Sequence, residues 1–139
     1  MCGPYFNLEA AKKSLDAVKG YDIHIYFTPG TESEWKAHET WQKLAFLFPA
    51  AIRDGSLVGK VGPHLKENVD LSLKKEHFGE VVAWLQQNNE GLSILIHPKT
   101  GDEWKDHMDS AMWIGKPEPF SEKFFAPLKP KTPPAPKFF

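Results

Sequence analysis

Apolar and polar residues alternate along residues 21–27, YDIHIYF, as they do in a β-strand that buries one of its faces. The apolar face carries Ile23, Ile25 and Phe27, and the opposite face carries His24. A histidine at this point of an apolar strand is unexpected, because valine or isoleucine would pack better there. We therefore predict a strand that buries one face and presents His24 on the other.

The same kind of pattern predicts two helices and three further strands. Residues 29–48 predict a helix with an apolar side, opened by Thr31 and Glu34 as a capping box. Residues 77–89 predict a second helix, closed by Gly91. The predicted strands are residues 56–61 (SLVGKV), 67–75 (ENVDLSLKK) and 92–97 (LSILIH).

This order of elements is that of the ferredoxin-like fold, an α+β fold with an antiparallel β-α-β-β-α-β sheet. In such a sheet the first and last strands are neighbours, and the third strand lies on the other side of the first. The helices cover one face only, and an uncovered apolar face usually marks an interface. We therefore expect a homodimer, a dimeric α/β barrel-like assembly with its site between the two sheets.

Alternation also brings several histidines onto the open face. If the apolar residues of 92–97 face the helices, His97 shares the open face with His24 on the neighbouring strand. His64 lies in the turn that leads to the strand on the other side of His24, so it can reach the same place. Neutral imidazoles suit iron, zinc, copper or nickel, and open coordination positions suit redox or hydrolytic chemistry. The alternative for each is a hydrogen-bonded structural histidine, the role that we assign to His38 and His77.

A carboxylate would complete a site of two histidines and one carboxylate. No local metal-binding spacing such as H-E-x-x-H occurs, so the proposed site depends on the fold. The alternative role for each acidic residue is that of a solvated loop or turn residue. The candidates are Asp22, Asp102, Glu103 and Asp106.

Composition narrows the possible functions. The 17 basic and 18 acidic residues leave a formal net charge of −1, which provides neither a basic surface for nucleic acid nor a polybasic membrane patch. The one cysteine, Cys2, excludes an intrachain disulfide and a cysteine-rich zinc site. The absence of a long apolar stretch and of a signal-peptide pattern favours a cytoplasmic protein.

Proline divides the chain. Seven of the twelve prolines lie between Lys116 and Phe139, which predicts an extended tail or a docking arm. We therefore expect an N-terminal extension over residues 1–17, one ferredoxin-like domain over residues 18–120 and a Pro-rich tail over residues 121–139.

Five segments together resemble the DOPA 4,5-dioxygenase family of small extradiol ring-cleaving enzymes. The most specific combination is His-Pro-x-Thr-Gly followed by Asp-His and Trp-x-Gly. The resemblance extends from about Tyr21 to Phe120. The segments are HIYF (24–27), VGPH (61–64), WLQQN (84–88), LSILIHPKTGD (92–102) and DHMDSAMWIG (106–115).

The resemblance implies a dioxygenase with a non-haem iron(II) site that cleaves a catechol such as L-DOPA with O2, beside the two hydroxyls. Zn2+ or Ni2+ can replace Fe2+ in a purified sample. Matched to the family motifs, His24, His64 and His97 are expected near the metal. His107 is expected as a fourth catalytic residue, acting as acid and base or holding the substrate.

The chain also departs from the family pattern. Asp22 stands where family members often carry a histidine, Leu65 where proline is common, and many members have an arginine near Asn89. Arg53 either pairs with a substrate carboxylate or favours a helix C-terminus before a DGS turn. Tyr26 and Trp113 either line an aromatic pocket or belong to the core.

Three other functions remain open on the same residues. The first is a relative without catalytic activity that binds a small aromatic molecule or a protein. The second is a zinc hydrolase that uses the same histidines, and the third is a ferredoxin-like monooxygenase without a cofactor. Metal content and O2 uptake distinguish these alternatives from an iron dioxygenase.

Overall fold

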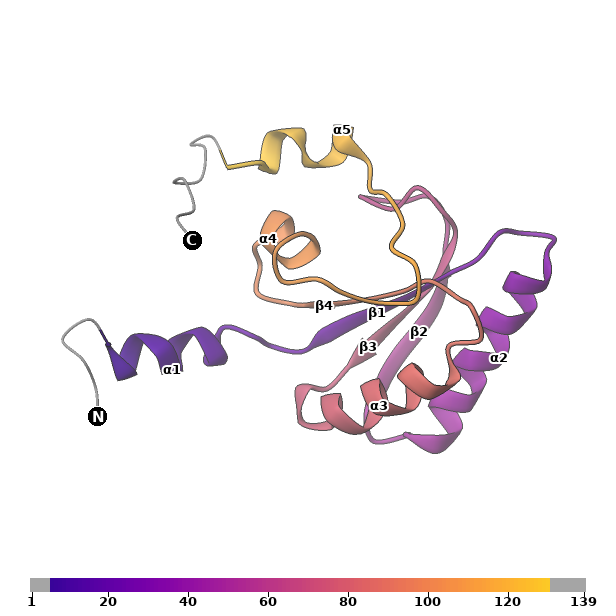
Figure 1. Ribbon diagram of the computed structural model, residues 1–139, viewed down its shortest axis with the longest axis horizontal. Coiled ribbons are helices and arrows are strands. Elements are labelled where there is room, and N and C mark those ends of the chain that lie inside the picture. The colour runs from indigo at the N-terminus through magenta and orange to yellow at the C-terminus, as the bar shows by residue number, and fades with distance from the viewer. Residues whose placement is uncertain (1–5, 131–139) are drawn as a thin grey trace.

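Strand β1 (Tyr21–Tyr26) occupies the centre of a five-stranded antiparallel sheet in the computed structural model, which describes residues 6–130 (Figure 1). Its neighbours are β3 (Asn68–Leu73) and β4 (Ile94–Pro98), so the predicted neighbours of the first strand are confirmed. The predicted ferredoxin-like α+β order is also confirmed. A fifth strand, which we did not predict, extends the sheet to the order β2-β3-β1-β4-β5, where the edge strands are β2 (Ile52–Val58) and β5 (Met112–Ile114).

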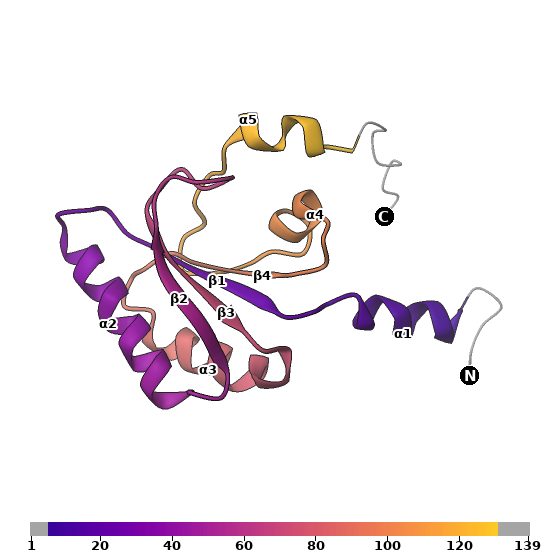
Figure 2. The same ribbon diagram turned by 180° about the vertical axis from the view of Figure 1, so that it is seen from behind.

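The predicted apolar face of the sheet is the core of the protein. Helices α2 (Glu32–Leu47) and α3 (Phe78–Asn88) lie against this face (Figures 1 and 2). The alternation on β1 therefore has the predicted phase. The most deeply buried branched aliphatic side chains of this core are those of Ile23, Ile25, Leu44, Val69, Leu71, Val81, Leu85, Ile94 and Ile96.

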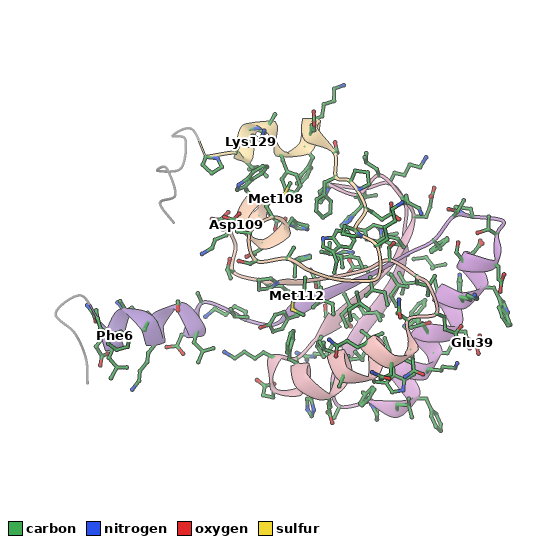
Figure 3. The ribbon with its side chains drawn as sticks, in the orientation of Figure 1. Phe6, Glu39, Met108, Asp109, Met112 and Lys129 are labelled. Atoms are coloured by element: carbon green, nitrogen blue, oxygen red, sulfur yellow. The ribbon has the colours of Figure 1, made fainter. Side chains whose placement is uncertain are left out.

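The other face of the sheet is not open, contrary to expectation. Helices α4 (Glu103–His107) and α5 (Glu122–Phe125) lie over it, opposite α2 and α3 (Figure 1). In Figure 3, Glu39 marks the α2 layer on one side of the sheet, and Lys129, just beyond α5, marks the layer on the other side. The same chain thus covers part of its own second face, while strand β2 stays largely exposed, and the expected homodimer stays a prediction.

Strand β2 begins earlier than predicted. The segment that we expected to be a DGS turn is a β-bulge inside the strand, between Arg53 and Gly55. Asp54 adopts a φ of 49°, a left-handed conformation that aspartate tolerates better than most residues. A Cβ at Gly55 would lie 2.5 Å from the indole of Trp41, so only glycine lets α2 pack this closely on β2. Arg53 is therefore a strand residue and not the end of a helix.

The ends of the two core helices differ in detail from the prediction. Thr31 is the N-cap of α2, but its hydroxyl bonds to the carbonyl of Thr28 and to Ser33, so the predicted capping box does not form. After α3, Glu90 takes the first left-handed position, with a φ of 50°, and Gly91 follows with a φ of 78°.

The segments on either side of the sheet domain are helical within the described residues. Helix α1 (Leu8–Asp16) has no buried residue and projects away from the sheet (Figure 1). On the C-terminal side, Phe125 of α5 is 1% exposed, so part of the expected Pro-rich tail packs against the domain. Short 3-10 turns at Lys75–His77 and Ala126–Leu128 complete the chain, and residues 131–139 of the expected tail lie outside the described part. Within residues 6–130, no helix has the length and apolar character needed to cross a membrane.

Candidate metal centre

Four histidines from four separate parts of the chain meet on the second face of the sheet. His24 comes from β1, His64 from the β2–β3 connection, His97 from β4 and His107 from α4. Their exposed fractions are between 4% and 7%. The ring centroids of His24 and His64 lie 4.2 Å apart, and those of His97 and His107 lie 4.0 Å apart. The structure thus brings together all four predicted site residues.

The strand register explains why two of these rings meet. His97 pairs across the strands with Asp22, and His24 lies two residues further along the same face of β1. Their Nε2 atoms are 3.2 Å apart. Alternation along the strand predicted this shared face correctly.

His24 is held by an amide on the neighbouring strand. Its Nδ1 lies 3.0 Å from Oδ1 of Asn68, whose own amide nitrogen donates to the carbonyl of Lys66. That second bond identifies the atom facing His24 as the amide oxygen, which only accepts hydrogen bonds. Nδ1 of His24 therefore carries the proton, and the neutral ring presents a lone pair at Nε2.

His97 and His107 are oriented in the same way by backbone carbonyls. Nδ1 of His97 lies 2.9 Å from the carbonyl oxygen of Pro98, and Nδ1 of His107 lies 2.9 Å from that of Glu103. A carbonyl can only accept, so each Nδ1 donates and each neutral ring keeps its Nε2 lone pair. Partners of this kind are typical of histidines that bind metals.

The contact between His24 and His97 supports a cation site. Two Nε2 lone pairs that face each other at 3.2 Å repel unless positive charge lies beside both. Two imidazole nitrogens bound to one metal at about 2.0–2.1 Å are roughly 2.9–3.4 Å apart for bond angles between square and tetrahedral. The observed separation falls within this interval, so the pair fits a bound metal ion.

His64 differs from the other three because its partner is a hydroxyl group. Nδ1 of His64 lies 2.6 Å from the hydroxyl oxygen of Tyr26. Burial raises the pKa of Tyr26 well above its ordinary value, so the phenol keeps its proton and donates it to Nδ1. Nε2 of neutral His64 then carries a proton, so this ring is a hydrogen-bond donor in the site.

Burial also keeps three rings of the cluster neutral. It lowers the pKa of His64 to about 3 and that of His97 to about 4, and the neighbouring histidines add to both effects. Burial also lowers the pKa of His24, although the hydrogen bond to Asn68 opposes the change. Near neutral pH these rings are uncharged, as metal ligands must be.

Among the acidic candidates, Asp22 lies nearest to the paired histidines. One carboxylate oxygen is 3.6 Å from Nε2 of His97, and the other is 3.0 Å from Nζ of Lys99. Two sets of three side chains could each hold a metal ion, because the potential ligand atoms within each set lie within 4.8 Å of one another. His24 belongs to both sets. The sets are Asp22 with His24 and His97, and His24 with His64 and His107.

Of the other acidic candidates, Glu103 lines the cavity beside the histidines, with a carboxylate oxygen 3.7 Å from Nδ1 of His107, and the remaining two have structural roles. Asp106 is 3% exposed, not solvated as expected, and it accepts bonds from the backbone and the hydroxyl of Thr100. Asp102 caps α4 by accepting from the backbone of Lys105. Together they fix α4, and with it His107, over the sheet. The segment that ends at His107 is therefore a helical turn in which Asp106 and His107 are buried.

A cavity of about 280 Å³ opens beside the four histidines. Its wall also includes Asp22, Asp70, Val58 and Val61. Burial and the neighbouring charge of Asp22 raise the pKa of Asp70 to about 6. The cavity has room for one aromatic ring in contact with the proposed metal ligands.

Several residues of the site were missed from the sequence. Asn68 belongs to a strand that we predicted, but nothing local showed that its amide faces His24. Phe120 and Phe125 cover the far side of the cluster, with ring centroids 5.6 Å from that of His107. His38 lies on α2 between Phe27 and Trp41, and His77 pairs with Glu80, so both lie outside the site as predicted.

The two aromatic candidates take different places. Tyr26 is 3% exposed and bonds to His64, so it belongs to the site. Trp113 on β5 stacks against Tyr26 and lies against Phe120, with centroids 5.8 Å apart in both pairs. Trp113 therefore packs against two residues of the site and has no direct contact with the four histidines among the aromatic pairs of residues 6–130.

Comparison with known proteins gives a family match. Residues 21–124 match the Dopa 4,5-dioxygenase family. The chain is 31% identical over 118 residues to an uncharacterised 21.2 kDa protein of Botryotinia fuckeliana. It is 29% identical over 113 residues to a DOPA 4,5-dioxygenase of Amanita muscaria. These alignments cover 78% and 75% of this chain but 64% and 48% of the relatives, so the chain spans less than two thirds of either relative.

A solved structure shares the fold. The crystal structure of a candidate dioxygenase from Nostoc punctiforme PCC 73102 superposes with a TM-score of 0.70 at 30% sequence identity. The match covers 82% of this chain and 96% of that chain. The similarity thus extends over most of this chain.

Proposed function

Because the chain belongs to the Dopa 4,5-dioxygenase family, we propose that it is a metal-dependent dioxygenase that opens the ring of a catechol. The observation that carries this proposal is the pair of acceptor nitrogens of His24 and His97, 3.2 Å apart beside a cavity. The proposed metal is iron(II), and the proposed reaction is extradiol cleavage. The ring opens between a hydroxylated carbon and its unsubstituted neighbour, and both atoms of O2 enter the product.

We assign the metal to His24, His97 and Asp22. This set is a two-histidine, one-carboxylate site, the arrangement found in non-haem iron(II) oxygenases with open coordination positions. Bound there, iron(II) supplies an electron-rich centre for O2 and a positive charge that makes the catechol hydroxyls more acidic. The alternative set uses His64 and His107 in place of Asp22 and His97, and His24 belongs to both sets.

The remaining histidines have distinct proton-handling roles in this proposal. His107 presents a lone pair at Nε2 because the carbonyl of Glu103 holds its Nδ1 proton, so it can accept a proton from a catechol hydroxyl. His64 presents an N–H because Tyr26 donates to its other nitrogen, so it can donate a hydrogen bond to developing negative charge. One base and one donor thus face the same cavity.

The covering layer buries the far side of the histidine cluster. Phe120 and Phe125 press against His107 and, in the case of Phe120, also against His64 at 6.1 Å between centroids. A low-dielectric wall of this kind strengthens every charge interaction inside the site. It also fixes the ring of His107 from a side that is not part of the cavity wall.

The test is O2 uptake by protein loaded anaerobically with iron(II), against a panel of catechols that includes L-DOPA and caffeate. We expect O2 consumption and a yellow ring-opened product, both lost in His97→Ala and retained in the control His77→Ala. Protein loaded with zinc should be inactive. Iron bound at full occupancy without O2 uptake on any catechol would contradict the proposal.

A further inference from the structure

A basic pocket lies at one end of the sheet, next to the candidate metal centre. Its volume is about 190 Å³. Four cationic side chains line it against one carboxylate, that of Asp54. Such an excess of positive charge in a pocket attracts an anion. The cationic residues are Lys19, Arg53, Lys74 and Lys99.

The strand register places this pocket on the same face as the histidines. Arg53 pairs with Ser72, Ser72 pairs with Asp22, and Asp22 pairs with His97. Residues paired in this way point to the same side of a sheet. One row of side chains therefore runs from the basic pocket to the proposed metal ligands.

Lys99 joins the two sites physically. Its Nζ lies 3.0 Å from the carboxylate of Asp22 in the metal centre and 3.0 Å from the hydroxyl of Ser72 in the basic pocket. Two other cations of the pocket have no such partner: within residues 6–130, no carboxylate forms an ion pair with Arg53 or Lys74. Their charge is available to a ligand.

We propose that this pocket binds the carboxylate at the end of the side chain of a catechol substrate, with Arg53 as the main partner. The inference rests on the proposed function, which puts the diol of the same molecule at His24 and His97. It makes Arg53 a specificity-determining residue that favours anionic catechols over neutral ones. Planar guanidinium groups suit carboxylates because they donate two parallel hydrogen bonds.

The distances select the length of the side chain. Neighbouring strands lie about 4.8 Å apart, and Ser72 is two strands from His97, so these residues are roughly 10 Å apart. Arg53 lies on the next strand beyond Ser72, and its long side chain can extend back toward Ser72. In 3-(3,4-dihydroxyphenyl)propanoate, the extended carboxylate lies roughly 10 Å from a metal bound to the hydroxyls. In 3,4-dihydroxybenzoate the carboxylate is attached directly to the ring and lies about 2 to 3 Å closer to the metal, so it would fall short of Arg53.

The first experiment is calorimetric binding of three catechols to the zinc-loaded protein, which holds the diol without turnover. The ligands are 3-(3,4-dihydroxyphenyl)propanoate, 3,4-dihydroxybenzoate and the neutral 4-methylcatechol. Arg53→Gln should weaken binding of the propanoate about tenfold, weaken the benzoate less, and leave 4-methylcatechol unchanged. The control Lys12→Gln removes the same charge from exposed α1 and should change none of them. Equal losses for all three ligands, or no loss for the propanoate, would overturn the inference.

A second measurement separates this inference from the proposed function. Binding of 3-phenylpropanoate, which has no diol, to the metal-free protein should also weaken in Arg53→Gln, as followed by NMR titration. If that dependence holds while no catechol is cleaved, the carboxylate site stands and the proposed reaction fails. Inorganic phosphate should compete with the propanoate and not with 4-methylcatechol. Phosphate that binds without displacing the propanoate would show a separate anion site and overturn the inference.

Discussion

The amide oxygen of Asn68 lies 3.0 Å from Nδ1 of His24 and determines which nitrogen of that ring carries the proton. Asn68 itself is fully buried. Without this partner, Nδ1 would be buried and unsatisfied, and the ring would lose both its orientation and its preferred tautomer. The metal-binding properties of His24 therefore depend on a residue of the neighbouring strand.

Replacing Asn68 by alanine should lower the affinity for zinc about 10- to 100-fold, because partners of ligand histidines contribute that much in metal sites. Calorimetric titration of zinc into the metal-free variant measures the change. Asn88→Ala, which removes an exposed amide bonded to the carbonyl of Trp84, is the matched control and should bind like the parent protein. An unchanged affinity in Asn68→Ala would mean that His24 is not a ligand.

Asp22→Asn should lower metal affinity by at least about 100-fold, because the variant keeps the shape of the side chain but removes a charged ligand. His64→Gln should lower it less than about tenfold, since His64 presents an N–H and not a lone pair. Titration of cobalt(II), followed by its visible absorption, reports both affinity and geometry. The reverse order of effects would favour the set of His24, His64 and His107.

The metal-free protein should lose stability in acid. The pKa of His64 falls from 6.5 to about 3 and that of His97 from 6.5 to about 4 on burial, so between these values the unfolded chain binds more protons than the folded one. The free energy of unfolding therefore decreases as the pH falls from about 7 to 4, by on the order of 2 kcal/mol per histidine at pH 5. Urea unfolding between pH 4 and 8 measures this. His64→Gln should flatten the dependence, and His77→Gln should not.

Asp70→Asn should stabilise the metal-free protein at pH 8. Burial raises the pKa of Asp70 from 3.8 to about 6, so the folded state binds the extra proton, and the free energy of unfolding falls as the pH rises through this interval. Removing the charge should restore about 1 to 2 kcal/mol above pH 6, after allowance for solvent screening, and nothing at pH 4. Thermal unfolding at the two pH values is the measurement. Asp109→Asn, at an exposed position, is the control; a gain at pH 4 as large as at pH 8 would exclude the electrostatic explanation.

Gly115→Ala should destabilise the protein by about 2 to 4 kcal/mol. The residue has a φ of 81°, and a Cβ there would lie 2.3 Å from the carbonyl oxygen of Leu92, which is backbone and cannot move aside. Gly59→Ala places the same methyl group in open space and should cost far less. Equal changes in the free energy of unfolding by urea would mean that the turn after β5 relaxes.

Much of the fold follows from local patterns. The alternation in β1 and in residues 92–97 predicted both faces of the central strands, and the order of elements predicted their neighbours. The bulge at Arg53 and Gly55 was missed because Asp-Gly is also typical of turns, and only the packing of Trp41 on Gly55 favours the bulge. The short strand β5 and the helix around His107 were missed because segments of three and five residues have too little periodicity to be recognised.

The sequence by itself determined that His24 and His97 share a face, because strand alternation is a local property with a period of two residues. It also contained the motifs that identify the family. Only the tertiary structure decided what each ring can do, because the partners of the Nδ1 atoms include an amide on the neighbouring strand, outside the family motifs, and a tyrosine hydroxyl 38 residues from His64. The covering of the second face was likewise decided by packing: Phe120 and Phe125 bury the cluster through contacts that no local pattern encodes.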